Sequence, residues 1–135
     1  MTRILTPIVA MFVSLLMLAG CTETDEQVRS LLATFCPSAE TTFANYDAIA
    51  AAGVLSASTL RKGEVAKNAA NSVCTERETA TVASVTTAGV LAYAALRDAT
   101  KEAEARGVDV GYPVEMRQLR GTLSKMQQEI DRHGR

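Results

Sequence analysis

Cysteine and histidine are the side chains that most often bind zinc and form reactive thiol sites, and this sequence has three cysteines and one histidine. The cysteines are Cys21, Cys36 and Cys74, and the histidine, His133, lies among the last three residues. Zinc sites and redox-active thiols are typically marked by a Cys-x-x-Cys pair or by cysteines combined with several histidines. The sequence has neither pattern, so we expect no metal site and no catalytic cysteine.

The residues that other catalytic mechanisms need are also missing. A serine hydrolase combines its serine with a histidine base and a carboxylate, often on a Gly-x-Ser-x-Gly turn. The single histidine is in the C-terminal tail, and the sequence contains no such turn and no glycine-rich phosphate loop. We therefore expect a protein that is not an enzyme and that has no catalytic residues.

The N-terminal segment has the composition of a secretory signal peptide. Arg3 provides a positive charge, an apolar run extends from Ile8 to Leu18, and small residues precede Cys21. The apolar run is shorter than the roughly 20 residues that span a bilayer as a helix. We expect residues 1–20 to be removed as a signal peptide; an ordinary signal peptide with a coincidental cysteine, or an uncleaved anchor, is the alternative.

The four residues Leu18-Ala19-Gly20-Cys21 resemble the lipobox of bacterial lipoproteins. This resemblance implies that Cys21 carries a diacylglyceryl group on its sulfur, that the signal is cut before Cys21, and that the new amine is acylated. Two or more acyl chains anchor a protein stably, so the lipid bilayer is an expected partner. We expect no cofactor apart from the covalent lipid on Cys21. Position 22 is Thr rather than Asp, which in enterobacterial lipoproteins implies the outer membrane rather than the inner one. The chain would then face the periplasm.

With Cys21 assigned to the lipid, Cys36 and Cys74 remain as a pair in a compartment where disulfides persist. We expect a structural disulfide between them. On the chain-entropy model, closing this loop stabilises the fold by roughly 4 kcal/mol. Two free buried thiols and a reactive pair are the alternatives that the sequence leaves open.

Length and composition point to one folded domain, which we place at residues 21–135. The sequence has 135 residues, of which 47% are hydrophobic and 21% charged, as in globular proteins. Its formal net charge is −1. This balance gives no electrostatic basis for binding nucleic acid.

Apolar residues spaced three and four apart predict an all-α fold of four or five helices. The predicted helices are a first one ending near Phe35, a second from Ser38 to Gly53, a third from Ala57 to Cys74, and a long fourth one from Thr75 to Gly107. Cys36-Pro37 should break the first helix from the second. In this arrangement the disulfide clamps the open end of a helical hairpin, and the long alanine-rich helix packs against that hairpin.

The first part of the long helix, residues 79–96, carries no charge, which raises the alternative of a second membrane span. Its five hydroxyl residues make it too polar to insert well, so we expect a buried helix instead. Small residues recur there at every fourth position, at Ala80, Ser84, Ala88 and Ala92. They predict a ridge on which another helix can pack closely.

A loop at residues 106–113 precedes a C-terminal amphipathic helix at residues 114–132. The apolar residues of this helix have the spacing of a coiled coil over two heptads: Met116, Leu119, Leu123, Met126 and Ile130. Such a stripe either packs on the protein's own domain or forms a seam for a partner helix. We favour the first interpretation, since two heptads fall short of a sustained coiled-coil pattern.

The lipobox, the Cys36-Pro37 pair, the Ala52–Ser56 turn and the Val73-Cys74 pair resemble small lipoproteins of phage and prophage regions in Gram-negative bacteria. The resemblance covers residues 18–74 and implies an accessory role in the host envelope. We expect an interaction module that binds an envelope or phage protein. One alternative is an outer-membrane spanin-like lysis component, although many of those are richer in proline. Another is a carrier of a lipid or small ligand, which the abundance of alanine disfavours because small side chains draw helices together.

Substitution of Cys21 tests the lipid attachment. We expect Cys21→Ser to leave an unprocessed or mislocalised precursor, because the acylated sulfur is absent. The intact mass of the wild-type protein should exceed that of residues 21–135 by the mass of its acyl groups. Equal membrane retention of the two forms, with no mass increment in the wild type, would refute the assignment.

Overall fold

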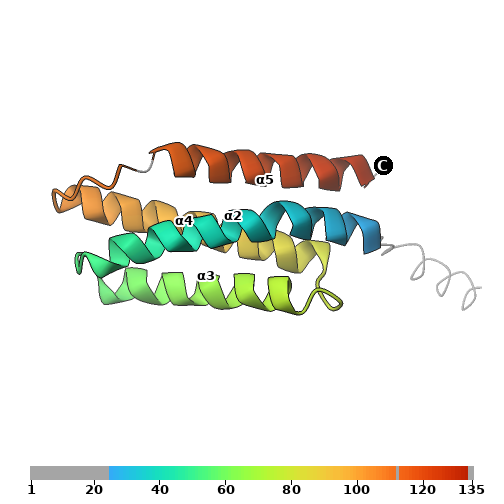
Figure 1. Cartoon of the computed structure of the whole chain (residues 1–135), viewed down its shortest axis with the longest axis horizontal. Helices are drawn as coiled ribbons and strands as arrows, with labels where there is room; N and C mark the ends of the chain where they lie inside the picture. Colours follow the sequence, from blue (N-terminus) through green and yellow to red (C-terminus); the bar gives the residue numbers. More distant parts are fainter. Residues whose placement is uncertain (1–24, 112, 134–135) are drawn as a thin grey trace, which may run out of the picture.

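The computed structural model describes residues 25–111 and 113–133, which form four helices (Figure 1). The helices are α2 (Asp25–Ala51), α3 (Ala57–Thr75), α4 (Val82–Ala105) and α5 (Pro113–His133). These described residues contain no β-strand, so the predicted all-α fold is confirmed. None of the four helices combines the length and the apolar composition that a bilayer span requires.

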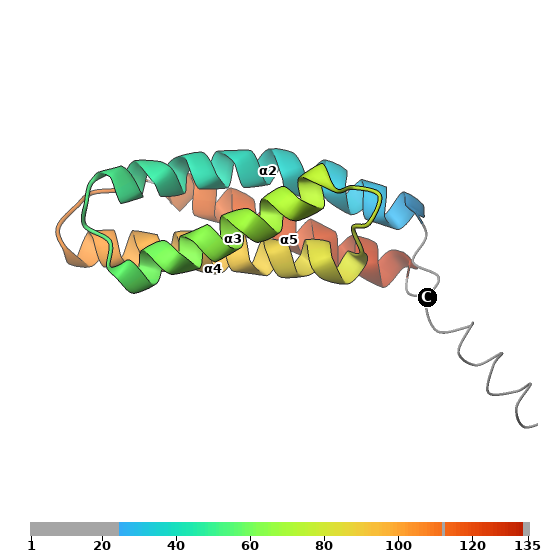
Figure 2. The same cartoon turned by 90° about the horizontal axis from the view of Figure 1, so that it is seen from below.

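Successive helices run in opposite directions, so the chain forms an up-and-down bundle (Figures 1 and 2). α2 and α4 form its centre, because each of them contacts the other three helices. α3 and α5 flank this central pair on opposite sides and make no contact with each other among the described residues. The bundle therefore has a close diagonal, α2 with α4, and a distant one, α3 with α5.

The close diagonal depends on the buried face of α4, which consists mostly of alanine. Ala88, Ala92, Ala95, Ala99 and Ala103 are each at most 2% exposed. Alanine extends little from the helix axis, so the Cα atoms of α2 and α4 can approach within 8 Å. The prediction of a small-residue ridge is right for its second half and wrong for its first. Ala80 precedes α4 and packs against the core, and Ser84 belongs to the cap of α4.

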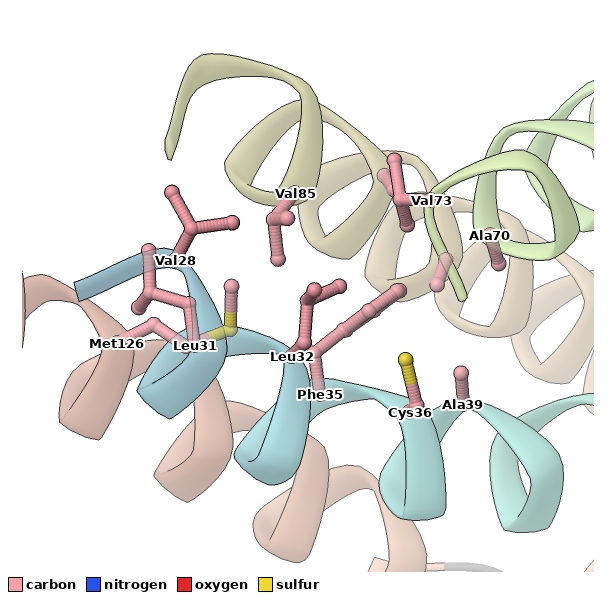
Figure 3. Packing of buried hydrophobic residues seen from close by; sticks show 12 residues of the cluster. Val28, Leu31, Leu32, Phe35, Cys36, Ala39, Ala70, Val73, Val85 and Met126 are labelled. Carbon is pink, nitrogen blue, oxygen red and sulfur yellow. The ribbon is translucent and has the colours of Figure 1, made fainter. Parts of the chain in front are cut away.

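Two groups of buried side chains fill the bundle, one toward each end. The group nearer the start of α2 holds the larger residues, and Figure 3 shows Leu32 and Phe35 of α2 pointing toward Val73 of α3 and Val85 of α4. The other group combines Tyr46 and Ile49 with Leu96 and four alanines, Ala66, Ala95, Ala99 and Ala103. Burial of a large apolar side chain contributes roughly 1.5–3 kcal/mol, so the few bulky residues supply much of the stability.

The prediction of two helices separated at Cys36-Pro37 is wrong, because α2 continues through Pro37. Proline removes one helical hydrogen bond, here the one to the carbonyl of Ala33, and its ring crowds that carbonyl. Both residues lie on the exposed side of α2, so water can solvate the unpaired carbonyl. On the opposite side, the buried stripe from Val28 to Ile49 runs on without a break. Packing of this stripe on α4 outweighs the local preference of proline.

The prediction that the long helix starts at Thr75 is also wrong. The backbone N–H of Glu76 donates to the Ser72 carbonyl at 2.8 Å and ends α3, and α4 begins only at Val82. The cap is Thr81, whose hydroxyl accepts from the Ser84 N–H at 3.1 Å while the Ser84 hydroxyl accepts from the Thr81 N–H at 2.9 Å. Residues 76–81 connect the two helices, and the chain reverses direction there because α3 and α4 are antiparallel.

Both predicted glycine stops are confirmed. Gly53 ends α2 with a φ of 70°, and Gly107 follows α4 with a φ of 78°. After α4, the Gly107 N–H donates to the Glu104 carbonyl at 2.9 Å and the Val108 N–H donates to the Ala103 carbonyl at 3.0 Å. This pair of bonds is the Schellman arrangement, which requires a left-handed residue and so favours glycine.

Tyr46 of α2 fixes the distance between α2 and α3. Its hydroxyl donates to the Thr59 carbonyl at 2.9 Å, and its ring lies directly against the backbone of Gly63. Lys67 stands above the same ring, 5.5 Å from its centroid, and also forms an ion pair with Asp47. A side chain at position 63 would occupy the volume of the tyrosine ring.

Gly63→Ala tests this contact. The new methyl group would overlap a 3% exposed aromatic ring that is held at both ends, so we expect a loss of about 1–3 kcal/mol in the free energy of unfolding. Gly121→Ala is the matched control, because nothing lies within 4 Å of a Cβ built at this exposed helical position. It should stabilise the fold by up to about 1 kcal/mol. Urea unfolding of both variants measures the difference, and equal stability of the two would contradict the packing described.

Candidate functional site

Cys36 of α2 and Cys74 of α3 form a disulfide with a Cα–Cα distance of 5.9 Å, which confirms the predicted pair. Cys36 lies inside α2 rather than at the start of a helix, so the first eleven residues of α2, 25–35, extend beyond the clamp. In this form neither sulfur is a free thiol. Cys21 and the lipobox residues Leu18, Ala19 and Gly20 lie outside the described residues.

A polar cluster joins the α2–α3 turn to α4. The Ser56 backbone N–H donates to Glu102 Oε1 at 2.8 Å, and the Ser56 hydroxyl donates to Oε2 at 3.2 Å. Arg106 adds a bond from Nη2 to Oε1 at 3.1 Å. Ser56 also caps α3, accepting from the Thr59 N–H at 3.3 Å. All these bonds join parts of the same chain, so the cluster has the character of a structural tie.

The electrostatics of this cluster agree with a structural role. The pKa of Glu102 is held below its ordinary value, first by the hydrogen bond of the Thr59 side chain and then by the bonds from Ser56 and the charge of Arg106. The pKa of Tyr46 is raised, mainly by burial and further by the charges of Asp47 and Glu102. Both shifts keep each group in one protonation state near neutral pH. In the described part of the chain, no group of three His, Cys, Asp or Glu side chains is placed to hold a metal ion.

An apolar groove of about 620 Å³ runs between α3 and α4 on the outer surface. Val65 of α3 and Leu91 and Ala94 of α4 form its apolar part, and Arg61 and Arg97 lie on its rim. Val65 is 56% exposed, and Leu91 and Ala94 are half-buried. The groove therefore keeps large apolar side chains in contact with water.

One negative charge lies on the rim of the groove, and it is neutralised. Asp98 accepts from Lys62 Nζ at 2.9 Å and from Arg97 Nη2 at 2.9 Å. These hydrogen bonds, that of Lys62 above all, hold the pKa of Asp98 below its ordinary value. The rim thus presents a net positive charge beside the apolar floor.

Sequence reasoning did not find this groove. The signal that could have found it is Val65, a large apolar residue that lies off the buried stripe of α3. Position on a helix alone does not show whether such residues are scattered or gathered, because α3 and α4 must first be aligned side by side.

The apolar stripe of α5 faces the protein's own core at the positions that the structure describes. Met126 is 2% exposed, and Leu123 and Ile130 pack against the buried group formed by α2 and α4. The side chains of Met116 and Leu119 lie outside the described residues. The three described members of the stripe thus pack on the protein's own domain, as the first of the two interpretations predicts.

Polar contacts accompany this packing. Thr122 of α5 and Ser38 of α2 share a hydrogen bond of 3.3 Å between their hydroxyls. Arg120 Nη2 donates to the Tyr93 hydroxyl on α4 at 3.3 Å, which raises the pKa of the guanidinium. α5 therefore meets both members of the central pair through polar as well as apolar groups.

Truncation of Met126 measures how much α5 depends on the core. We expect Met126→Ala to lower the free energy of unfolding by about 2–5 kcal/mol, because it leaves a cavity under α5. Gln128→Ala, two residues away on the exposed side, is the control and should stay within about 0.5 kcal/mol of the wild type. If Met126→Ala unfolds at the same urea concentration as the control, α5 contributes no stability through this side chain.

Comparison with known proteins assigns no family to this bundle. No family model, no curated protein and no solved structure matches the chain. The function is therefore inferred from the chain's own surfaces and from its N-terminal motif.

Proposed function

We propose that this protein is a lipid-anchored lipoprotein of the cell envelope whose helical domain binds another protein, without enzymatic activity. The anchor is the acylated Cys21, and the domain faces the periplasm, from the outer membrane in preference to the inner one. Its origin in a phage or prophage region, and an envelope or phage protein as partner, belong to the same proposal. The resemblance of Leu18-Ala19-Gly20-Cys21 to a lipobox supports the anchoring half of this proposal.

The α3–α4 groove is the observation that carries the interaction half. Apolar side chains that are gathered and left exposed beside charged ones are typical of protein interaction sites. The floor of the groove offers Val65 and Leu91, and the rim offers Arg61 and Lys62. Such a surface suits a partner segment that places apolar side chains in the groove and acidic ones over the rim.

The two alternative functions would use other parts of the bundle. A spanin-like component would pair the α5 stripe with a partner helix, but Leu123 and Met126 already pack on α2 and α4 and would first have to leave them. A carrier would need an internal cavity between the helices. The alanine face of α4 instead brings the central helices together, which favours a filled core.

Site-specific photo-crosslinking in cells tests the proposal. A photoreactive phenylalanine analogue at Val65 or Ala94 should give a discrete adduct with one envelope protein, because both positions lie in the groove. The same analogue at Ala44 or Gln128, exposed positions on α2 and α5, should not give this adduct. Arg61→Glu combined with Arg97→Glu should reduce the groove adduct, because the rim charge is reversed.

Two results would contradict the proposal. One is the absence of an adduct from both groove positions, and the other is the same adduct from all four positions. The melting temperature of each variant should be compared with that of the wild type in parallel. A lost adduct then reports a change in the surface and not a loss of the fold.

A further inference from the structure

A pocket of about 540 Å³ lies at the end of the bundle where α2 begins. Its floor includes Val28 and Leu32, and its remaining lining includes two arginines and two carboxylates: Asp25, Arg29, Arg77 and Glu78. The first two of these are on α2 and the other two are on the connection between α3 and α4. Figures 1 and 2 show this connection at the same end of the bundle as the start of α2.

The four charged side chains of this pocket do not neutralise one another. Asp25 and Arg29 stand four residues apart on α2, a spacing at which opposite charges often pair. No ion pair joins any of the four to another residue in the described part of the chain, whereas Lys62 with Asp98 and Arg106 with Glu102 do pair elsewhere. Arg77 donates only its Nε, to the Cys74 carbonyl at 3.1 Å. Both arginines therefore have guanidinium N–H groups available for a ligand.

The covalent geometry of the chain limits where this pocket can be, provided that Cys21 is acylated. Asp25, which lines the pocket, follows Cys21 by four residues. Four residues span at most about 14 Å even when fully extended. The pocket would then lie at the surface of the bilayer, and the groups at highest concentration around it would be lipid headgroups.

We propose that this pocket binds a zwitterionic lipid headgroup that carries a phosphate and a primary ammonium, as in phosphatidylethanolamine. This inference rests on the proposed lipid anchor at Cys21. Arginine binds phosphate oxygens in a bidentate manner, which suits Arg29 and Arg77. The carboxylates of Asp25 and Glu78 accept hydrogen bonds from the ammonium group.

The lining also selects among headgroups. A quaternary ammonium is recognised mainly by aromatic rings, and none of the described residues that line this pocket is aromatic. An anionic headgroup without an amine carries no positive charge of its own that could pair with Asp25 and Glu78. A headgroup with a primary ammonium therefore satisfies both signs of charge. The anchor also supplies a high effective concentration, so a weak intrinsic affinity is sufficient.

Titration of the intact acylated protein in a non-ionic detergent tests this site. The probe is a short-chain phosphatidylethanolamine, with short-chain phosphatidylglycerol, phosphatidylcholine and inorganic phosphate as comparisons, and calorimetry measures binding. We expect saturable binding that is strongest for phosphatidylethanolamine. Arg29→Ala combined with Arg77→Ala should weaken it by about tenfold or more, because both phosphate donors are lost.

Substitution of the carboxylates separates recognition of the amine from general attraction to phosphate. Asp25→Asn combined with Glu78→Gln should weaken binding of phosphatidylethanolamine while strengthening binding of phosphatidylglycerol, because two repulsive charges are removed. Arg61→Ala is the control, since it removes an exposed arginine from the α3–α4 groove and should leave lipid binding unchanged. All four residues are exposed, so the melting temperatures of the variants should match that of the wild type.

Three results would overturn the inference: equal binding of the three lipids, inorganic phosphate binding as tightly as phosphatidylethanolamine, or binding unaffected by loss of both arginines. The mass of the intact protein is measured in the same preparation. An acylated protein that does not bind the headgroup overturns the pocket assignment and leaves the anchor in place. A protein without acyl groups that still binds it supports the pocket and refutes the anchor.

Discussion

The contact between α2 and the alanine face of α4 is the constraint on which the rest of this bundle depends. Because Ala88, Ala92 and Ala99 extend so little from α4, the two helices lie close together along the short diagonal. This contact leaves α3 and α5 on opposite sides, where each packs against both helices of the central pair. The larger side chains, such as Phe35, fill the core that the central pair forms with the two flanking helices.

The two flanking helices are held to the central pair in different ways. α3 is tied to α2 by the disulfide and by Tyr46 against Gly63, and to α4 through the Ser56–Glu102 bonds. Among described side chains, α5 relies on Leu123, Met126 and Ile130 with a few polar contacts.

Asn45 and Thr86 each bury a polar atom that has no described hydrogen-bond partner. They lie seven residues from Ser38 and Tyr93, which contact α5, so two helical turns place both atoms on the side of the central pair that faces α5.

The same architecture separates the two surfaces to which we assign binding. The headgroup-binding pocket is formed where α2 begins and α3 connects to α4, whereas the lining of the α3–α4 groove comes from the first half of α3 and the middle of α4. Since α3 and α4 are antiparallel, this groove lies toward the opposite end of the bundle. A short link from Cys21 would hold the first surface on the bilayer and present the second away from it.

Local sequence determined several features because neighbouring residues alone decide them. Helix periodicity predicted the all-α class, and Gly53 and Gly107 marked helix ends where a left-handed residue is needed. The disulfide joins residues 38 apart, and the count of cysteines, rather than local structure, predicted it. Only the tertiary structure decided that α2 passes through Pro37 and that Val65 and Leu91 share a groove. Each of these depends on contacts between residues far apart in the chain. Their burial energy outweighs the local preference of a proline, and the spacing of residues along one helix does not reveal it.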